Sequence, residues 1–131
     1  MSLSFCISHY IGPIEPILDC ISSSDVHVYN KSNSELTLRS SIKVTRTSNY
    51  GYNISSYLMY IIDNYYQLPD RVAFLKSNVF PRHVSKAFFM KALNNSGDFV
   101  AISDESNFLH KGWPFSFTSG DNMLYELNNS W

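Results

Sequence analysis

The segment at residues 76–83 (KSNVFPRH) concentrates the side chains in this chain that are best suited to hold a phosphate. Lys76 and Arg82 carry positive charges, Asn78 can donate and accept hydrogen bonds, and His83 titrates near neutral pH. One interpretation is an anion site with two cations, in which His83 acts as a general acid or base. The other is an ordinary exposed loop whose charged groups lie in water.

A second candidate site is the segment at residues 49–53 (NYGYN), which leads from an expected strand into an expected helix. Gly51 permits a positive φ or the close approach of a ligand, and a helix N-terminus offers N–H donors to an anion. Asn49 and Gly51 are therefore candidate substrate-binding residues, together with Lys31, which follows another expected strand. The simpler interpretation is a loop in which Asn53 caps the helix. Neither GxGxxG nor GxxxxGK[ST] occurs, so the chain has no standard nucleotide-binding loop.

Asp104 and Glu105 form a close acidic pair after the last expected strand. A carboxylate there could activate an acceptor hydroxyl, so Asp104 joins His83 as a candidate catalytic residue. Nucleotide-sugar transferases often hold Mg²⁺ or Mn²⁺ through Asp-x-Asp at a strand end. The sequence SDES is not that motif, so the cofactor stays unknown and no metal ligand is assigned. The chain also lacks GxSxG, which a serine hydrolase with a nucleophile elbow would carry.

Strands and helices alternate along the chain, and this alternation must position the candidate residues. Strands are expected at residues 3–11, 26–29, 42–47, 72–75 and 99–102, and helices at 13–21, 54–66, 85–93 and 123–127. The alternation predicts a single α/β domain over residues 1–131, with a mostly parallel sheet covered on both faces. Ligands of such sheets bind beyond the carboxyl ends of the strands, where the segments above lie.

The helix expected at residues 54–66 has the clearest apolar pattern, with spacings of three and four residues. We expect its core-facing side chains to be Ile54, Tyr57, Leu58, Ile61, Ile62 and Tyr65. Cys6 and Cys20 lie in apolar runs, so both are expected to be free and largely buried thiols.

The composition argues against several classes of protein. The 131 residues are 44% hydrophobic, which supports a core, and the net charge of −1 is unlike that of a general nucleic-acid binder. No run approaches the ~18 apolar residues of a membrane span, and the N-terminus does not read as a secretory signal, so a cytoplasmic location is expected. Ser (21) and Asn (12) supply a quarter of the chain. Such an uncharged polar surface suits sugars, and equally reflects compositional bias.

Five short segments, in a fixed order, resemble an uncharacterised domain-of-unknown-function family. They are SHY at 8–10, VYNK at 28–31, NYG at 49–51, YLMYIIDNY at 57–65 and LPDRVAFLK at 68–76, and they cover roughly the first two thirds of the chain. The family is found in fungal and bacterial proteins and is linked to surface-polysaccharide and glycosyltransferase genes. This chain has Tyr52-Asn53 where the family has Arg-Glu, and Lys76 where the family often has Gln. Family members usually continue beyond the position of Trp131, so a C-terminal truncation is expected.

The resemblance implies a Rossmann-like fold of the nucleotide-sugar-transferase kind and a role in glycan synthesis. Our first hypothesis is a glycosyltransferase-like domain that acts on a nucleotide-activated sugar in bacterial surface-polysaccharide (capsule or lipopolysaccharide) biosynthesis. The alternative is a non-catalytic carbohydrate-binding or assembly module, which the missing Asp-x-Asp and the lost Arg-Glu pair favour. A small phosphate-ester hydrolase is a third hypothesis, and it rests on the basic segment 76–83 alone.

Overall fold

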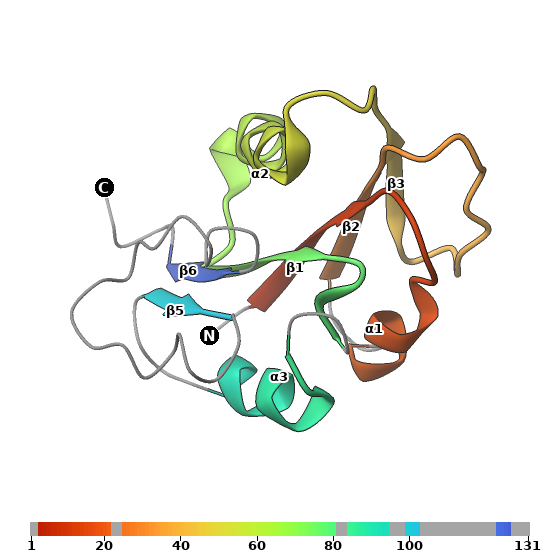
Figure 1. Cartoon of the computed structure of the whole chain (residues 1–131). Coiled ribbons are helices and arrows are strands. Elements are labelled where there is room, and N and C mark those ends of the chain that lie inside the picture. Colours follow the sequence, from red (N-terminus) through yellow and green to blue (C-terminus); the bar gives the residue numbers. More distant parts are fainter. Residues whose placement is uncertain (1–2, 22–24, 81–83, 95–98, 103–122, 127–131) are drawn as a thin grey trace.

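The computed structural model describes residues 3–21, 25–80, 84–94, 99–102 and 123–126 (Figure 1). The elements in chain order are β1 (Leu3–His9), α1 (Glu15–Cys20), β2 (Asp25–Asn30), β3 (Lys43–Arg46), α2 (Tyr52–Asp63), a 3₁₀ turn (Tyr65–Gln67), β4 (Arg71–Lys76), α3 (Lys86–Leu93), β5 (Phe99–Ala101) and β6 (Met123–Glu126).

Four of the strands form a parallel sheet in the order β3-β2-β1-β4, which confirms the predicted α/β class. The chain builds outward from β1 to β3 and then returns to the other side of β1, so the strand order reverses between β1 and β4. Strand β6 pairs antiparallel with β4, and β5 pairs with β6. The helix expected at residues 123–127 is therefore wrong. The backbone of β6 instead satisfies the N–H and C=O groups that an unpaired β4 edge would expose.

Helices cover both faces of the parallel strands, with α1 and α3 on one face and α2 on the other (Figure 1). Side chains of β1 alternate between two clusters: Phe5 and Ile7 pack in the larger one, and Cys6 in the smaller one. The larger cluster includes Ile17 of α1 and Phe89 of α3. This burial on both faces explains why β2 and β4 are short apolar runs rather than alternating ones.

The face of α2 that packs on the sheet differs from the predicted one. Its buried side chains are Ser56, Tyr57 and Tyr60, with Ile61 partly buried. The predicted core residues Ile54, Leu58, Ile62 and Tyr65 are 51%, 53%, 73% and 64% exposed.

The contact between α2 and β1 explains why α2 buries a different face from the predicted one. The Ser56 hydroxyl lies 3.0 Å from the Ser8 hydroxyl, and the backbone carbonyl of Ser56 accepts a hydrogen bond from the Cys6 thiol at 3.9 Å, so Ser56 faces β1. Tyr57 and Tyr60 then pack against Phe74, with ring centroids 5.1 and 6.0 Å apart.

Two smaller predictions, on the cap of α3 and on the cysteines, can be compared with the structure. The Ser85 side chain accepts a hydrogen bond from the Phe88 N–H at 3.1 Å and caps α3 as predicted. Cys6 and Cys20 are both free thiols, as expected, but only Cys6 is fully buried. Burial raises the pKa of the Cys6 thiol well above its usual value, which keeps it protonated.

Candidate functional site

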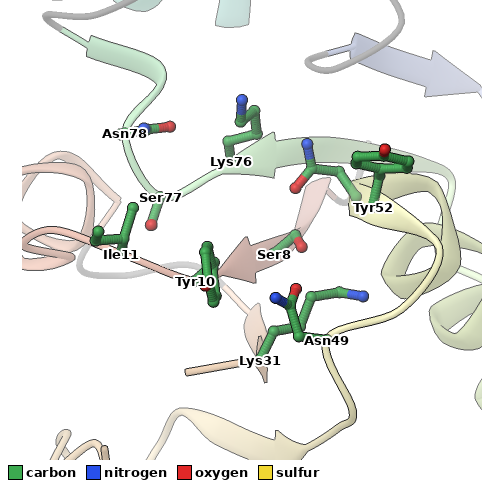
Figure 2. Close-up of a pocket in the computed structure, with 10 residues that line it drawn as sticks. Ser8, Tyr10, Ile11, Lys31, Asn49, Tyr52, Lys76, Ser77 and Asn78 are labelled. Atoms are coloured by element: carbon green, nitrogen blue, oxygen red, sulfur yellow. The ribbon is translucent and has the colours of Figure 1, made fainter. Parts of the chain in front are cut away.

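A pocket of about 180 Å³ lies at the carboxyl ends of the parallel strands (Figure 2). Its lining residues follow or end four different strands, and they are Ser8, Tyr10, Ile11, Lys31, Asn49, Tyr52, Asn53, Lys76, Ser77 and Asn78. The pocket therefore spans the point between β1 and β4 where the strand order reverses. In open α/β sheets this reversal leaves a crevice in which ligands commonly bind.

The charge of the pocket favours an anion. Among the described residues that line it, Lys31 and Lys76 are basic and none is acidic. Figure 2 shows the two lysines on either side of Ser8, as expected from the strand order β2-β1-β4. Uncharged donors and acceptors complete the lining, notably the side chains of Asn49 and Asn78.

Lys31 is a buried cation that is held in place by the loop before α2. Only 5% of Lys31 is exposed, and its ammonium group donates to the Tyr50 carbonyl at 2.8 Å and to the Ser55 hydroxyl at 2.6 Å. Burial lowers the pKa of Lys31, because removal from water penalises the charged form. The Tyr50 carbonyl and the Ser55 hydroxyl are both uncharged, so a negatively charged ligand would compensate for the lost hydration of this group.

The loop before α2 contains two consecutive left-handed residues, Gly51 (φ 73°) and Tyr52 (φ 53°). The predicted positive φ of Gly51 is thus confirmed, and a Cβ there would lie 2.8 Å from the Cβ of Ser55. Helix α2 begins at Tyr52 with Gly51 as its N-cap, so the assignment of Asn53 as the cap is wrong. The Ser55 hydroxyl holds the loop instead, with the carbonyls of Tyr50 and Tyr52 at 2.7 and 3.0 Å.

His9 and Ser77 form a buried polar pair beside the pocket. The Nδ1 atom of His9 lies 2.8 Å from the Ser77 hydroxyl, and both residues are 4% exposed. Their backbones are also fixed: the Ser77 N–H donates to the Ser8 carbonyl at 3.1 Å, and the Lys31 N–H donates to the His9 carbonyl at 2.7 Å. Burial lowers the pKa of His9, and the charge of Glu15 opposes this, so the imidazole is neutral at pH 7.

The structure brings four of the predicted site residues together, namely Lys31, Asn49, Lys76 and Asn78. Gly51 does not line the pocket but shapes the loop that presents Tyr52. Arg82, His83 and Asp104 lie outside the described residues. The roles assigned to all of these residues in substrate binding or catalysis stay predictions.

Sequence reasoning did not select Ser8, Tyr10, Tyr52 or Ser77 as site residues, nor His9 beside them. Only their place in the sequence could have identified these residues, because each lies at or just beyond the end of a strand or the start of a helix. Within the described ranges, no three His, Cys, Asp or Glu side chains are grouped closely enough to hold a metal ion. The helices of the described part of the chain are all too short or too polar to cross a membrane.

A family model described as "Protein of unknown function (DUF3431)" matches residues 18–96. The chain belongs to this family. The matched region of the DUF3431 domain contains the loops after β2, β3 and β4, and with them Lys31, Asn49 and Lys76. Membership of a domain-of-unknown-function family is thereby confirmed, while the comparisons carry no link to glycosyltransferases. Searches of curated proteins and of solved structures found no match.

Proposed function

We propose that this DUF3431 protein is a glycosyltransferase-like domain that binds a nucleotide-activated sugar, with the diphosphate between Lys31 and Lys76. The observation that carries the proposal is the pocket at the strand-order reversal, where the described lining has two lysines and no carboxylate. Surface-polysaccharide assembly, which the family resemblance implies, and a cytoplasmic location, which is expected from the sequence, belong to the same proposal.

The dimensions of the pocket suggest how such a ligand would divide between its interior and its rim. About 180 Å³ suits a diphosphate and part of a sugar ring, but not a whole nucleotide-sugar. The rest of the ligand would lie over the rim, where Tyr10 and Tyr52 are 53% and 88% exposed. Exposed tyrosine rings can stack on the face of a base or a sugar and still hydrogen-bond through their hydroxyl groups.

The two lysines would also favour transfer of the sugar. When the bond between the sugar and the diphosphate breaks, negative charge grows on the departing phosphate oxygen. A cation held in place before the reaction stabilises that charge more strongly in the transition state than in the ground state. Lys31 is held in this way by Tyr50 and Ser55. His83 and Asp104 stay the predicted groups that activate the acceptor hydroxyl.

A thermal-shift panel of nucleotide-sugars, with and without Mn²⁺, tests the proposal. A ligand at ~100 times its Kd adds about 2.7 kcal/mol to the free energy of unfolding, which raises the Tm of a domain of this size by roughly 10 °C. Lys76→Gln should weaken binding about 10- to 100-fold, the scale of one charged hydrogen bond. Lys86→Gln, which removes an exposed charge from α3, is the matched control and should bind as the parent does. No shift with any donor would reject the proposal.

A non-catalytic carbohydrate-binding module is the second candidate, and the exposed rings of Tyr10 and Tyr52 favour it. Such a module would recognise sugar rings and would gain nothing from a diphosphate. Stabilisation by free oligosaccharides, unaffected by Lys76→Gln, would therefore select this candidate over the transferase. Stabilisation only by nucleotide-linked sugars would select the transferase.

A further inference from the structure

We propose that Ser77 is a nucleophile activated by His9, and that it cleaves acyl esters in the pocket through a serine-ester intermediate. This activity goes beyond nucleotide-sugar binding, which requires no covalent intermediate. The carrying observation is a hydroxyl and an imidazole nitrogen 2.8 Å apart, with the hydroxyl-bearing residue in the pocket lining.

The fold sets this pair up from two adjacent strands. β1 and β4 are parallel neighbours, and their register pairs Ser8 with Lys76, so the next residues, His9 and Ser77, also lie side by side. Ser77 directly follows a central parallel strand that leads toward a helix. Serine nucleophiles of α/β hydrolases occupy the same place in their fold, although this chain lacks their GxSxG motif.

The immediate surroundings suit the reaction. Both backbones are fixed by hydrogen bonds, so the serine and its base are held in position before a substrate arrives. Asn78 lines the same pocket next to Ser77, and its side-chain amide can donate to an oxygen that becomes negative. Glu15, whose charge acts on His9, would stabilise the imidazolium that forms during attack.

The steps balance with water as the only co-reactant. In the tautomer with hydrogen on Nε2, His9 Nδ1 takes the Ser77 hydroxyl proton while Oγ bonds to the ester carbonyl carbon, and the carbonyl electron pair moves to oxygen. The tetrahedral intermediate collapses, the bond to the alcohol breaks, and the alcohol leaves with the proton from His9. Water then attacks the carbonyl carbon of the acyl-serine and gives one proton to His9. The bond from that carbon to Ser77 Oγ breaks, His9 returns a proton to Oγ, and the carboxylic acid leaves. Because Lys31 and Lys76 line the pocket, the preferred substrate is an ester whose alcohol part is anionic.

A fluorophosphonate probe tests the nucleophile without knowledge of the natural substrate. In the full chain, the Ser77 Oγ–P bond should form as the P–F bond breaks, and fluoride leaves while the hydroxyl proton passes to His9. We expect peptide mass spectrometry to find the adduct on Ser77 at least ten times faster than on Ser8. Ser8 lies in the same pocket, but its hydroxyl is paired with Ser56 rather than with a histidine.

Two variants distinguish activation of Ser77 by His9 from simple accessibility of the Ser77 hydroxyl to the probe. His9→Gln should slow labelling of Ser77 at least ten-fold. His27→Gln is the matched control: His27 is also bonded to a hydroxyl, that of Thr45 at 2.7 Å, but neither residue lines the pocket, so labelling should be unchanged. The acyl-ester class is checked by transfer of acetyl from p-nitrophenyl acetate to Ser77, with release of p-nitrophenol.

Three results would overturn the inference. They are an absence of adduct on Ser77, equal labelling in native and urea-unfolded chain, and a His9→Gln variant that melts like the parent and labels at the parent rate. The first two need no variant, so the test holds even if His9→Gln does not fold. Binding of nucleotide-sugars is measured separately, so either claim can fail alone.

Discussion

Replacement of Tyr52 by glycine should leave the fold as stable as it is now, which is unusual for the loss of a large aromatic side chain. Tyr52 is the one non-glycine residue with a positive φ, 53°, among the described residues, and its ring is 88% exposed. Lys31 and Ser55 hold the loop in this conformation through hydrogen bonds to the carbonyls of Tyr50 and Tyr52. The strained residue therefore presents its ring at the rim of the pocket, where we propose that it stacks on a ligand.

Three contributions set the expected change in the free energy of unfolding. Relief of the left-handed conformation stabilises the variant by about 1–2 kcal/mol. The larger conformational entropy of glycine in the unfolded chain opposes this by about 0.5–1 kcal/mol. The small buried part of the ring adds a loss of about 0.5 kcal/mol. The net change is thus small, between a loss of about 0.5 and a gain of about 1 kcal/mol.

Tyr66→Gly is the matched comparison, because Tyr66 is 95% exposed and has no positive φ to relieve. Glycine there should lower the free energy of unfolding by about 1 kcal/mol or more, since only the entropy loss and the contact with Tyr65 remain. Urea denaturation of both variants measures the difference, which should be about 1–2 kcal/mol in favour of the Tyr52 variant. Equal destabilisation of the two variants would refute the argument from strain.

Three further predictions test the packing. The pKa of His27 is lowered to about 4, chiefly by burial, so only the unfolded chain binds this proton as pH falls from 6.5 toward 4. Between pH 7 and pH 4.5 the free energy of unfolding of the parent, measured by urea denaturation, should therefore fall by about 2 kcal/mol more than that of His27→Gln. An equal fall in the two proteins would contradict this. Tyr57→Ala should lower the free energy of unfolding by about 3 kcal/mol and Ile62→Ser by less than about 0.5, and the reverse order would contradict the observed face of α2. Tyr29→Phe should lower the free energy of unfolding by about 1 kcal/mol, because it removes the hydrogen bond from the Tyr29 hydroxyl to Asp63; an unchanged Tm in thermal melting would contradict this.

The parallel sheet could be predicted because strands alternate with helical patterns along the chain and two of them, β2 and β4, are short apolar runs. VHVY and VAFL are buried on both faces, and only a sheet covered by helices on both sides explains that. The turn at Gly51 and the cap at Ser85 could also be predicted, because they depend on the preferences of single residues for a positive φ and for a helix N-cap. The strand at residues 123–126 could not be predicted, because it forms only by pairing with β4, which is distant in the sequence.

The orientation of α2 could not be predicted from the pattern of apolar residues. Isoleucine ranks above serine and tyrosine in hydrophobicity, so the pattern favours Ile54 and Ile62 for the core. The contact between the Ser8 and Ser56 hydroxyls and the packing of Tyr57 and Tyr60 on Phe74 arise only when α2 lies on the sheet.

The candidate site was predictable to the extent that strand ends define it. The rule that ligands bind beyond the carboxyl ends of parallel strands identified Lys31, Asn49, Lys76 and Asn78, which share one pocket. The pairing of His9 with Ser77 depends on the register of β1 and β4, and the exposure of Tyr52 depends on its φ. Neither quantity can be derived from one sequence.

A crystal structure of the protein with the nucleotide-sugar that stabilises it best would show directly where the diphosphate binds. We expect density for the diphosphate between the ammonium groups of Lys31 and Lys76, with the base or sugar against the ring of Tyr52. A nucleotide-sugar bound elsewhere, with the pocket between β1 and β4 holding only solvent, would contradict it.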